Sequence, residues 1–192
     1  MNQVRAFIAI DLPPSLQSSI ELNLTRLRQA LGDELIRWTP PENMHLTLKF
    51  LGNVPAAHIG FLKQMTTQAA GQVSPFDLTI SGLGSFPNPK RIRVLWAGIH
   101  AGSELTRLQR GIEAGAANLG REKDERPFSP HLTVARVRQG MDENSLRTVR
   151  NAVATFQLGR IGTARVESVH LYRSDLHTDG STYTKLFSAP LR

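Results

Sequence analysis

One short pattern, His-Leu-Thr followed by an aliphatic residue, occurs twice in the chain: "HLTL" begins at His45 and "HLTV" begins at His131. The chain has only 6 histidines, and two such matches are expected by chance roughly 10⁻⁴ times per sequence of this length. Successive side chains of a strand point to opposite faces, so each copy would present its histidine and threonine together, opposite its aliphatic residues. Either copy alone would be typical of a structural core histidine. The matched pair favours a shared functional site.

Two imidazoles suit paired general acid–base catalysis, because this side chain titrates near neutral pH and one ring can give a proton while the other takes one. Such a pair serves an in-line displacement at phosphorus, in which a base activates the entering oxygen and an acid protonates the leaving oxygen. Threonine hydroxyls can donate hydrogen bonds to the non-bridging oxygens, where negative charge builds up. We therefore predict that His45, Thr47, His131 and Thr133 are catalytic, with neither a metal ion nor another cofactor. These residues alone leave open which histidine is the acid.

Two residues beside the second motif are predicted to bind substrate. Arg136 would face away from His131 in a regular strand, but a bulge near Ala135 would turn it toward the site, where it could contact phosphate. A solvated arginine is the alternative. Phe128 could stack on a nucleobase or belong to the core, and the sequence does not separate these roles.

The composition is that of a basic protein without cysteine, in which 23 Lys plus Arg against 16 Asp plus Glu give a net charge of +7. This excess favours a polyanionic partner such as nucleic acid. Arg91 and Arg93 share one strand face, which is more typical of a solvated face than of a phosphate track. The lack of cysteine excludes disulfides, thiol nucleophiles and zinc ribbons. With no signal peptide and no long apolar run, we expect a cytoplasmic protein without a membrane segment.

Hydrophobic periodicity predicts both strands and helices along the chain. Gly32 is expected to end the first helix. Arg37 and Trp38 are expected to lead into the first motif strand, and "GSFPNPK" (84–90) to connect two strands as a loop. The predicted strands are 4–10, 45–51, 76–83, 91–99, 131–137, 164–172 and 182–190, and the predicted helices are 15–31, 55–71, 102–119 and 142–156, the last capped by Asp142.

After each motif strand the predicted order is the same: helix, strand, loop and strand. This repeat predicts an α+β fold of two pseudo-symmetric lobes, each an antiparallel sheet with helices on its outer face, around a central cleft. Residues 1–192 would form a single bilobal domain whose motif strands, 45–51 and 131–137, meet across that cleft.

The segment "DLHTDG" (175–180) places Asp175, His177 and Asp179 in alternation, a pattern that can indicate a metal site. It is more simply a hairpin connection with Asp-Gly at its turn. We therefore predict no metal site.

Several longer segments resemble one known family along nearly the whole chain: "FIAIDLPP", "RWTPPENMHLTLKFLG", "GLGSFPNPKRIRVLWAGI", "RPFSPHLTVAR" and "VESVHLYRSDLHTDGSTYTKL". The sequence resembles the RNA 2′,3′-cyclic phosphodiesterases, also called 2′-5′ RNA ligases, of the two-histidine phosphoesterase superfamily. The resemblance implies a bilobal α+β fold, hydrolysis of an RNA terminal 2′,3′-cyclic phosphate to a 2′-phosphate, and reversible 2′-5′ ligation. It also implies that His45 is the proton donor and His131 the proton acceptor, and it supports a substrate role for Arg136.

Other functions are also consistent with these residues. The same chemistry could act on a small cyclic nucleotide, on ADP-ribose 1″,2″-cyclic phosphate or on 2′-5′-linked oligoadenylates, and a non-catalytic RNA-binding module could keep the fold. The basic charge favours a polymer, and binding alone would not require both histidines and both threonines. We expect a monomer whose partner is RNA with a 2′,3′-cyclic phosphate terminus, including RNA derived from tRNA.

Overall fold

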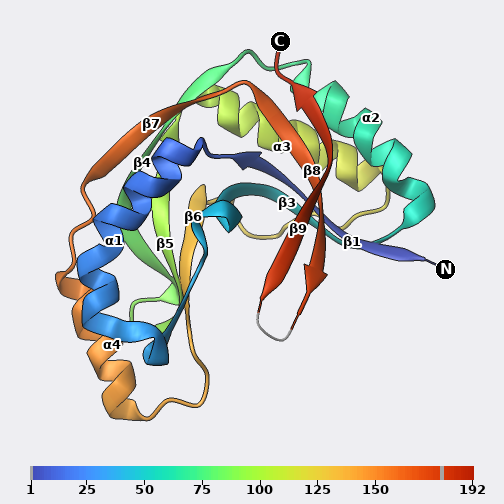
Figure 1. Cartoon of the computed structure of the whole chain (residues 1–192). Helices are drawn as coiled ribbons and strands as arrows, with labels where there is room; N and C mark the ends of the chain where they lie inside the picture. Colours follow the sequence, from blue (N-terminus) through green and yellow to red (C-terminus); the bar gives the residue numbers. More distant parts are fainter. Residues whose placement is uncertain (1, 178–179) are drawn as a thin grey trace.

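The computed structural model describes residues 2–177 and 180–192, which form two antiparallel sheets that curl around a shared concave side (Figure 1). The first sheet, called sheet A, has the strand order β3-β1-β8-β9, and sheet B has the order β2-β6-β5-β4-β7. The strands of sheet A are β1 (Gln3–Asp11), β3 (His45–Pro55), β8 (Ser168–Leu176) and β9 (Ser181–Pro190). Those of sheet B are β2 (Ile36–Trp38), β4 (Phe76–Asn88), β5 (Arg91–Ala101), β6 (His131–Val137) and β7 (Arg160–Val166).

Each sheet combines one motif strand with a hairpin from the other half of the chain. The hairpin β4–β5 follows the first motif but pairs with β6, the second motif strand, while the hairpin β8–β9 lies in the sheet of β3. The predicted α+β fold with two antiparallel sheets is confirmed. The lobes are nevertheless interleaved, so neither half of the chain could complete its sheet alone.

Four helices cover the convex sides of the sheets: α1 (Pro14–Leu35) and α4 (Glu143–Thr155) lie on sheet B, and α2 (Ile59–Ala70) and α3 (Ser103–Asn118) lie on sheet A (Figure 1). The buried face of α1 is formed by Leu16, Ile20, Leu24, Leu27 and Leu31. Gly32 was expected to end this helix but only interrupts it, with a φ of 64° that favours glycine, and the helix continues to Leu35. Asp142 caps α4 as predicted, because its Oδ1 accepts from the backbone N–H of Ser145 at 2.7 Å.

Three further predicted boundaries were wrong. The strand expected over 164–172 is divided at Glu167 into β7 and β8, because the chain leaves sheet B there and enters sheet A. The helix expected over 55–71 begins at Ile59, since Pro55 still pairs in β3 and a 3-10 turn follows it. The loop expected over 84–90 is mostly strand, because β4 continues to Asn88.

The sequence suggested that Arg37 and Trp38 lead into the first motif strand, and this prediction was wrong. They form the short strand β2, which pairs with β6 in the opposite sheet. The predicted hairpin between β8 and β9 is present, closed by a backbone hydrogen bond of 2.7 Å from His177 N–H to the carbonyl of Gly180. Asp179 lies outside the described residues. Within the described ranges, no helix is both long and apolar enough to cross a membrane.

Candidate active site

The first motif occupies the start of β3, where the alternation expected of a strand is clear. His45 and Thr47 are half-buried on the cavity side, whereas Leu46 and Leu48 are buried in the core. The pairing with β1 then skips a residue, because Ile8 pairs with Lys49 and Ala9 with Thr47, which leaves Leu48 as a β-bulge.

The second motif repeats this geometry on β6. His131 and Thr133 are half-buried on the cavity side, and Leu132 and Val134 are in the core. Here Leu95 pairs with Ala135 and Trp96 with Thr133, so Val134 forms a bulge at the position equivalent to that in β3.

The bulge in β6 has a consequence for Arg136. In a regular strand this residue would face the core side, but after the extra residue it is exposed and lines the same cavity as His131. The equivalent position after the bulge in β3 is Phe50, whose side chain is also exposed and lines the cavity. The equivalent β-bulges in β6 and β3 therefore direct a cationic side chain into the cavity from one wall and an aromatic side chain from the other.

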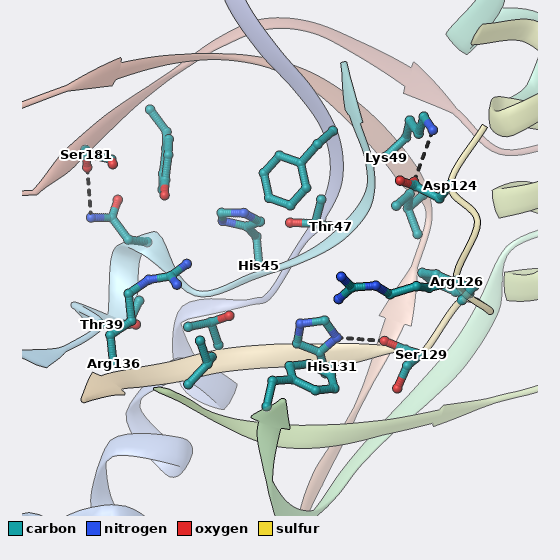
Figure 2. Close-up of a pocket in the computed structure, with 18 of the residues that line it drawn as sticks. Thr39, His45, Thr47, Lys49, Asp124, Arg126, Ser129, His131, Arg136 and Ser181 are labelled. Carbon is teal, nitrogen blue, oxygen red and sulfur yellow. Dashed lines mark hydrogen bonds and ion pairs between the residues drawn. The ribbon is translucent and has the colours of Figure 1, made fainter. Parts of the chain in front are cut away.

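Both motifs line one cavity of about 1250 Å³ between the two sheets. Figure 2 shows His45 and Thr47 on one side of it and His131 and Arg136 on the other. Thr133 and Phe128 line the cavity too. Phe128 also packs against the core. The structure thus brings together all six residues predicted from the sequence to form the site.

His45 lies among aromatic rings. Its imidazole stacks on Phe7 with a centroid distance of 4.8 Å, and Tyr183 meets it edge-on at 5.1 Å. Burial lowers the pKa of His45 below 6.5, although a hydrogen bond with the backbone of Asn43 and the negative charge of Asp11 partly oppose this. The neutral ring is therefore favoured in the free protein at neutral pH.

Asp11 ends β1 opposite His45 and is held by three side chains. The hydroxyl of Tyr172 donates to it at 2.6 Å, Lys185 Nζ lies at 2.7 Å, and His170 Nε2 lies at 3.5 Å. Burial alone would raise the pKa of Asp11, but the hydrogen bonds from Lys185 and Tyr172 outweigh it and hold the pKa below 3.8. Asp11 is thus a fixed negative charge near His45.

His131 is held by both a hydrogen bond and packing. Its Nδ1 lies 2.7 Å from the carbonyl oxygen of Ser129. Because a carbonyl can only accept, Nδ1 carries a proton, and Nε2 of the neutral ring has the free lone pair. Phe86 packs edge-on against the imidazole at 4.9 Å. Trp96 lies behind, over Gly84, where an added Cβ would come within 2.1 Å of the indole ring.

A buried lysine attaches the loop before β6 to the floor of the cavity. Lys49 is 3% exposed, and its ammonium group contacts Glu113 Oε1 at 2.7 Å, Asp124 Oδ2 at 3.0 Å and the backbone carbonyl of Glu122 at 2.8 Å. Burial disfavours the charged form, but the hydrogen bonds that Lys49 donates to Glu113 and Asp124 outweigh it and raise the pKa of Lys49 above 10.5. The loop is thereby held where Arg126 reaches between Thr47 and His131 (Figure 2).

The sequence reasoning did not identify Arg126, Phe50, Phe86, Tyr183 or Lys49 as part of this site. Arg126 belongs to a charged segment without periodicity, and Lys49 occupies a strand position that usually carries an exposed charge. The signal that could have been used is the pseudo-symmetry, because it makes Phe50 the counterpart of Arg136. Within the described ranges, no group of three or more His, Cys, Asp or Glu side chains is arranged to hold a metal ion.

Comparison with known proteins places this geometry in a family. An RNA 2′,3′-cyclic phosphodiesterase of Methanothermobacter thermautotrophicus is 33% identical over 96% of this chain and 97% of its own length. A protein of the same name from Thermus thermophilus is 31% identical over 98% of this chain and 91% of its own length.

Solved structures give the same result. The TT0787 protein of Thermus thermophilus superposes with a TM-score of 0.80 at 28% identity, covering 98% of both chains. The LigT protein of E. coli, complexed with 3′-AMP, superposes with a TM-score of 0.77 at 26% identity, covering 99% of both chains. The family model of the 2′-5′ RNA ligase superfamily matches residues 13–178. The chain belongs to the 2′-5′ RNA ligase superfamily.

Proposed function

We propose that this protein hydrolyses the 2′,3′-cyclic phosphate at the end of an RNA and leaves a 2′-phosphate. The observation that carries the proposal is the matched pair of His-x-Thr faces on opposite walls of one cavity. Relatives that carry the name RNA 2′,3′-cyclic phosphodiesterase support it, since they match almost the full chain. The 3′-AMP complex of the LigT protein supports a nucleotide with phosphate as the bound group.

In the proposed mechanism, His131 Nε2 takes a proton from water as the water oxygen bonds to phosphorus. The bond from phosphorus to O3′ breaks, and His45 gives its proton to O3′. The Nδ1–Ser129 hydrogen bond supports the role of His131, because it leaves the lone pair of the neutral ring on Nε2. An RNA 5′-hydroxyl in place of water would form a 2′-5′ linkage by the same steps, which makes ligation reversible.

Hydroxyls and guanidinium groups stabilise the phosphate in this mechanism. Thr47 and Thr133 donate hydrogen bonds to the non-bridging oxygens, and Arg136 and Arg126 add positive charge from opposite ends of the cavity. Phe128 contributes a ring face for the terminal base. Phe50 offers a second ring, and its 63% exposure leaves it free to stack.

The finer parts of the proposal are the nature of the RNA and its setting. We propose a monomer that acts in the cytoplasm, in keeping with a sequence of 192 residues without cysteine. An RNA end, including one derived from tRNA, is favoured over a small cyclic nucleotide or ADP-ribose 1″,2″-cyclic phosphate because the net charge is +7.

A test of this function uses a short RNA ending in a 2′,3′-cyclic phosphate, incubated with the protein in excess EDTA. We expect turnover in the chelator and a 2′-phosphate as the product, identified by phosphorus NMR. A 3′-phosphate would overturn the assignment of O3′ as the leaving group. If the protein turned over cyclic mononucleotides but not RNA, its substrate would be a small cyclic nucleotide. If it were inactive on both, an RNA-binding module would be favoured.

The pH profile tests the role of His45. As the proton donor, His45 must be protonated in the free enzyme, and burial holds its pKa below 6.5. We therefore expect kcat/KM to fall as the pH rises through this pKa, so that the alkaline limb has its midpoint below pH 6.5. Asp11→Asn removes a charge that raises the pKa of His45 and should move this limb to lower pH. The matched control is Asp77→Asn, which removes a carboxylate that pairs with Arg165 on the outer strands of sheet B.

The direction of the shift decides the role. If Asp11→Asn instead moved an acidic limb, His45 would have to be neutral to act, and it would be the base. If the alkaline limb did not move in Asp11→Asn, or moved equally in Asp77→Asn, the pH dependence of kcat/KM would not arise from the titration of His45.

A further inference from the structure

A second hollow of about 870 Å³ adjoins the catalytic cavity. It lies where β5 begins and β6 ends, between these strands, the turn after β6 and α4. Val94 and Arg136 line both the hollow and the cavity, and they are paired across β5 and β6. A chain bound at the catalytic histidines could therefore continue past Arg136 into the hollow without leaving the protein surface.

The lining of this hollow is strongly basic. Its cations are Lys90, Arg91, Arg93, Arg136, Arg138 and Arg150, and the one carboxylate among the described residues that line it is Glu143, which pairs with Arg150. Within the described part of the chain, Arg91, Arg93 and Arg136 form no ion pair with a carboxylate. Most of this positive charge is uncompensated, and it would attract an anion with several charges.

Local structure holds these arginines in position. Phe86 pairs with Val94 and Pro87 with Ile92, so Arg93 is the extra residue of a bulge. The turn before it is closed by Asn88, whose Oδ1 accepts from the backbone N–H of Arg91 at 3.1 Å. Directly after β6, Arg138 Nε donates to the carbonyl of Asp33 at 2.8 Å. A strand bulge and these hydrogen bonds therefore fix the backbone at Arg91 and Arg93 and the guanidinium group of Arg138.

The size of the basic surface exceeds the need of a single phosphate. From His131 to Val137 the chain of β6 extends about 20 Å, at roughly 3.3 Å per residue. Arg126 and the threonines already surround the place of the cyclic phosphate at one end of this distance. The remaining cations lie beyond Arg136 and would contact phosphates that follow along a strand.

The opposite rim of the cavity is less suited to a polyanion. The loop there carries Lys123 and Arg126, but also Glu122, Asp124 and Glu125, and all five line the cavity. Asp124 is paired with Lys49, but a strand that left by this rim would still pass Glu122 and Glu125, which form no ion pair within the described residues. The charge distribution thus gives the bound strand one favoured direction.

We propose that this basic hollow binds the backbone phosphates of the RNA nucleotides that precede the cyclic end. The inference rests on the proposed function and deepens it, because it makes the substrate an oligonucleotide of several residues and not a terminal nucleotide alone. Arg91 and Arg93 would then contact phosphates, whereas the sequence analysis favoured a solvated strand face for them.

The test compares two substrates, adenosine 2′,3′-cyclic phosphate and an RNA octamer with a 2′,3′-cyclic phosphate end. The wild-type protein should have the higher kcat/KM on the octamer at low salt. In the double variant Arg91→Gln/Arg93→Gln, the ratio of octamer to mononucleotide kcat/KM should fall about 10- to 30-fold at 0.1 M salt, as expected for two lost phosphate contacts. The slope of log kcat/KM for the octamer against log salt should become shallower by about 1.4.

The control is Arg107→Gln/Arg110→Gln, the same charge change at two exposed positions of α3 that line neither the hollow nor the cavity. It should leave the ratio near the wild-type value. An equal fall of this ratio in both double variants would assign the effect to net charge and contradict a specific role of the hollow. If the ratio fell in neither variant, the hollow would not bind RNA phosphates, whereas continued turnover of the mononucleotide would still support the proposed function. A wild-type protein inactive on both substrates would overturn the proposed function itself.

Discussion

Replacing His131 with alanine is expected to lower kcat on an RNA 2′,3′-cyclic phosphate by about 10²–10⁴-fold, because in the proposed mechanism the attacking water then loses its general base. His45→Ala should cause a loss of similar size through the missing proton at O3′. Both side chains face the cavity, and the buried leucines on the other face of each strand are unchanged in these variants. The fold should therefore survive, which circular dichroism and thermal unfolding would check.

The double variant separates joint action from independent action. Since both proton transfers belong to one displacement, the loss in His45→Ala/His131→Ala should be much smaller than the product of the two single losses. His100→Ala provides the matched control, because His100 is an exposed histidine of β5 that does not line the cavity. Full activity in either motif variant, or an equal loss in the control, would contradict the two-histidine mechanism.

Replacing Lys49 with methionine is expected to reduce the free energy of unfolding by about 3 kcal/mol. All three ammonium protons have acceptors, and removal of the lysine leaves Glu113, 17% exposed, without its cation. For a chain of this size the melting temperature should fall by roughly 6–12 °C. Because the pKa of Lys49 is raised, its contribution is complete below pH 10.5 and is lost only as the pH rises through the folded-state value.

The same substitution should weaken substrate binding. Lys49 holds the loop that carries Arg126. Without this contact the loop should become more mobile, which should raise KM for the RNA substrate and make residues 120–130 a preferred site of proteolysis. Lys123→Met, an exposed lysine of the same loop, should leave the unfolding free energy within about 0.5 kcal/mol of the wild type.

A second substitution distinguishes the lost ion pair from a packing defect. Adding Glu113→Gln to Lys49→Met removes the unpaired carboxylate and should restore part of the lost stability, as urea titrations would measure. If the double variant were less stable than Lys49→Met, the destabilisation would have to come from packing around the new methionine.

The sequence by itself determined the local features of this protein. The alternation in "HLTL" and "HLTV" placed His45 and His131 on the opposite face from the core residues, and the tertiary structure keeps that arrangement. The leucine spacing of α1 and the cap of α4 at Asp142 were also readable, because helix periodicity and capping depend on residues within a few positions of one another.

Only the tertiary structure decided which sheet each strand joins. Nothing in "ARVESVHLY" marks Glu167 as the point where the chain changes sheets, since the residues on both sides have the same strand pattern. The partners of Lys49 lie 64 and 75 residues away in the sequence. The packing of Phe86 against His131 follows from a strand longer than its prolines suggested. Such contacts depend on register and on burial of whole sheet faces, which short-range patterns do not encode.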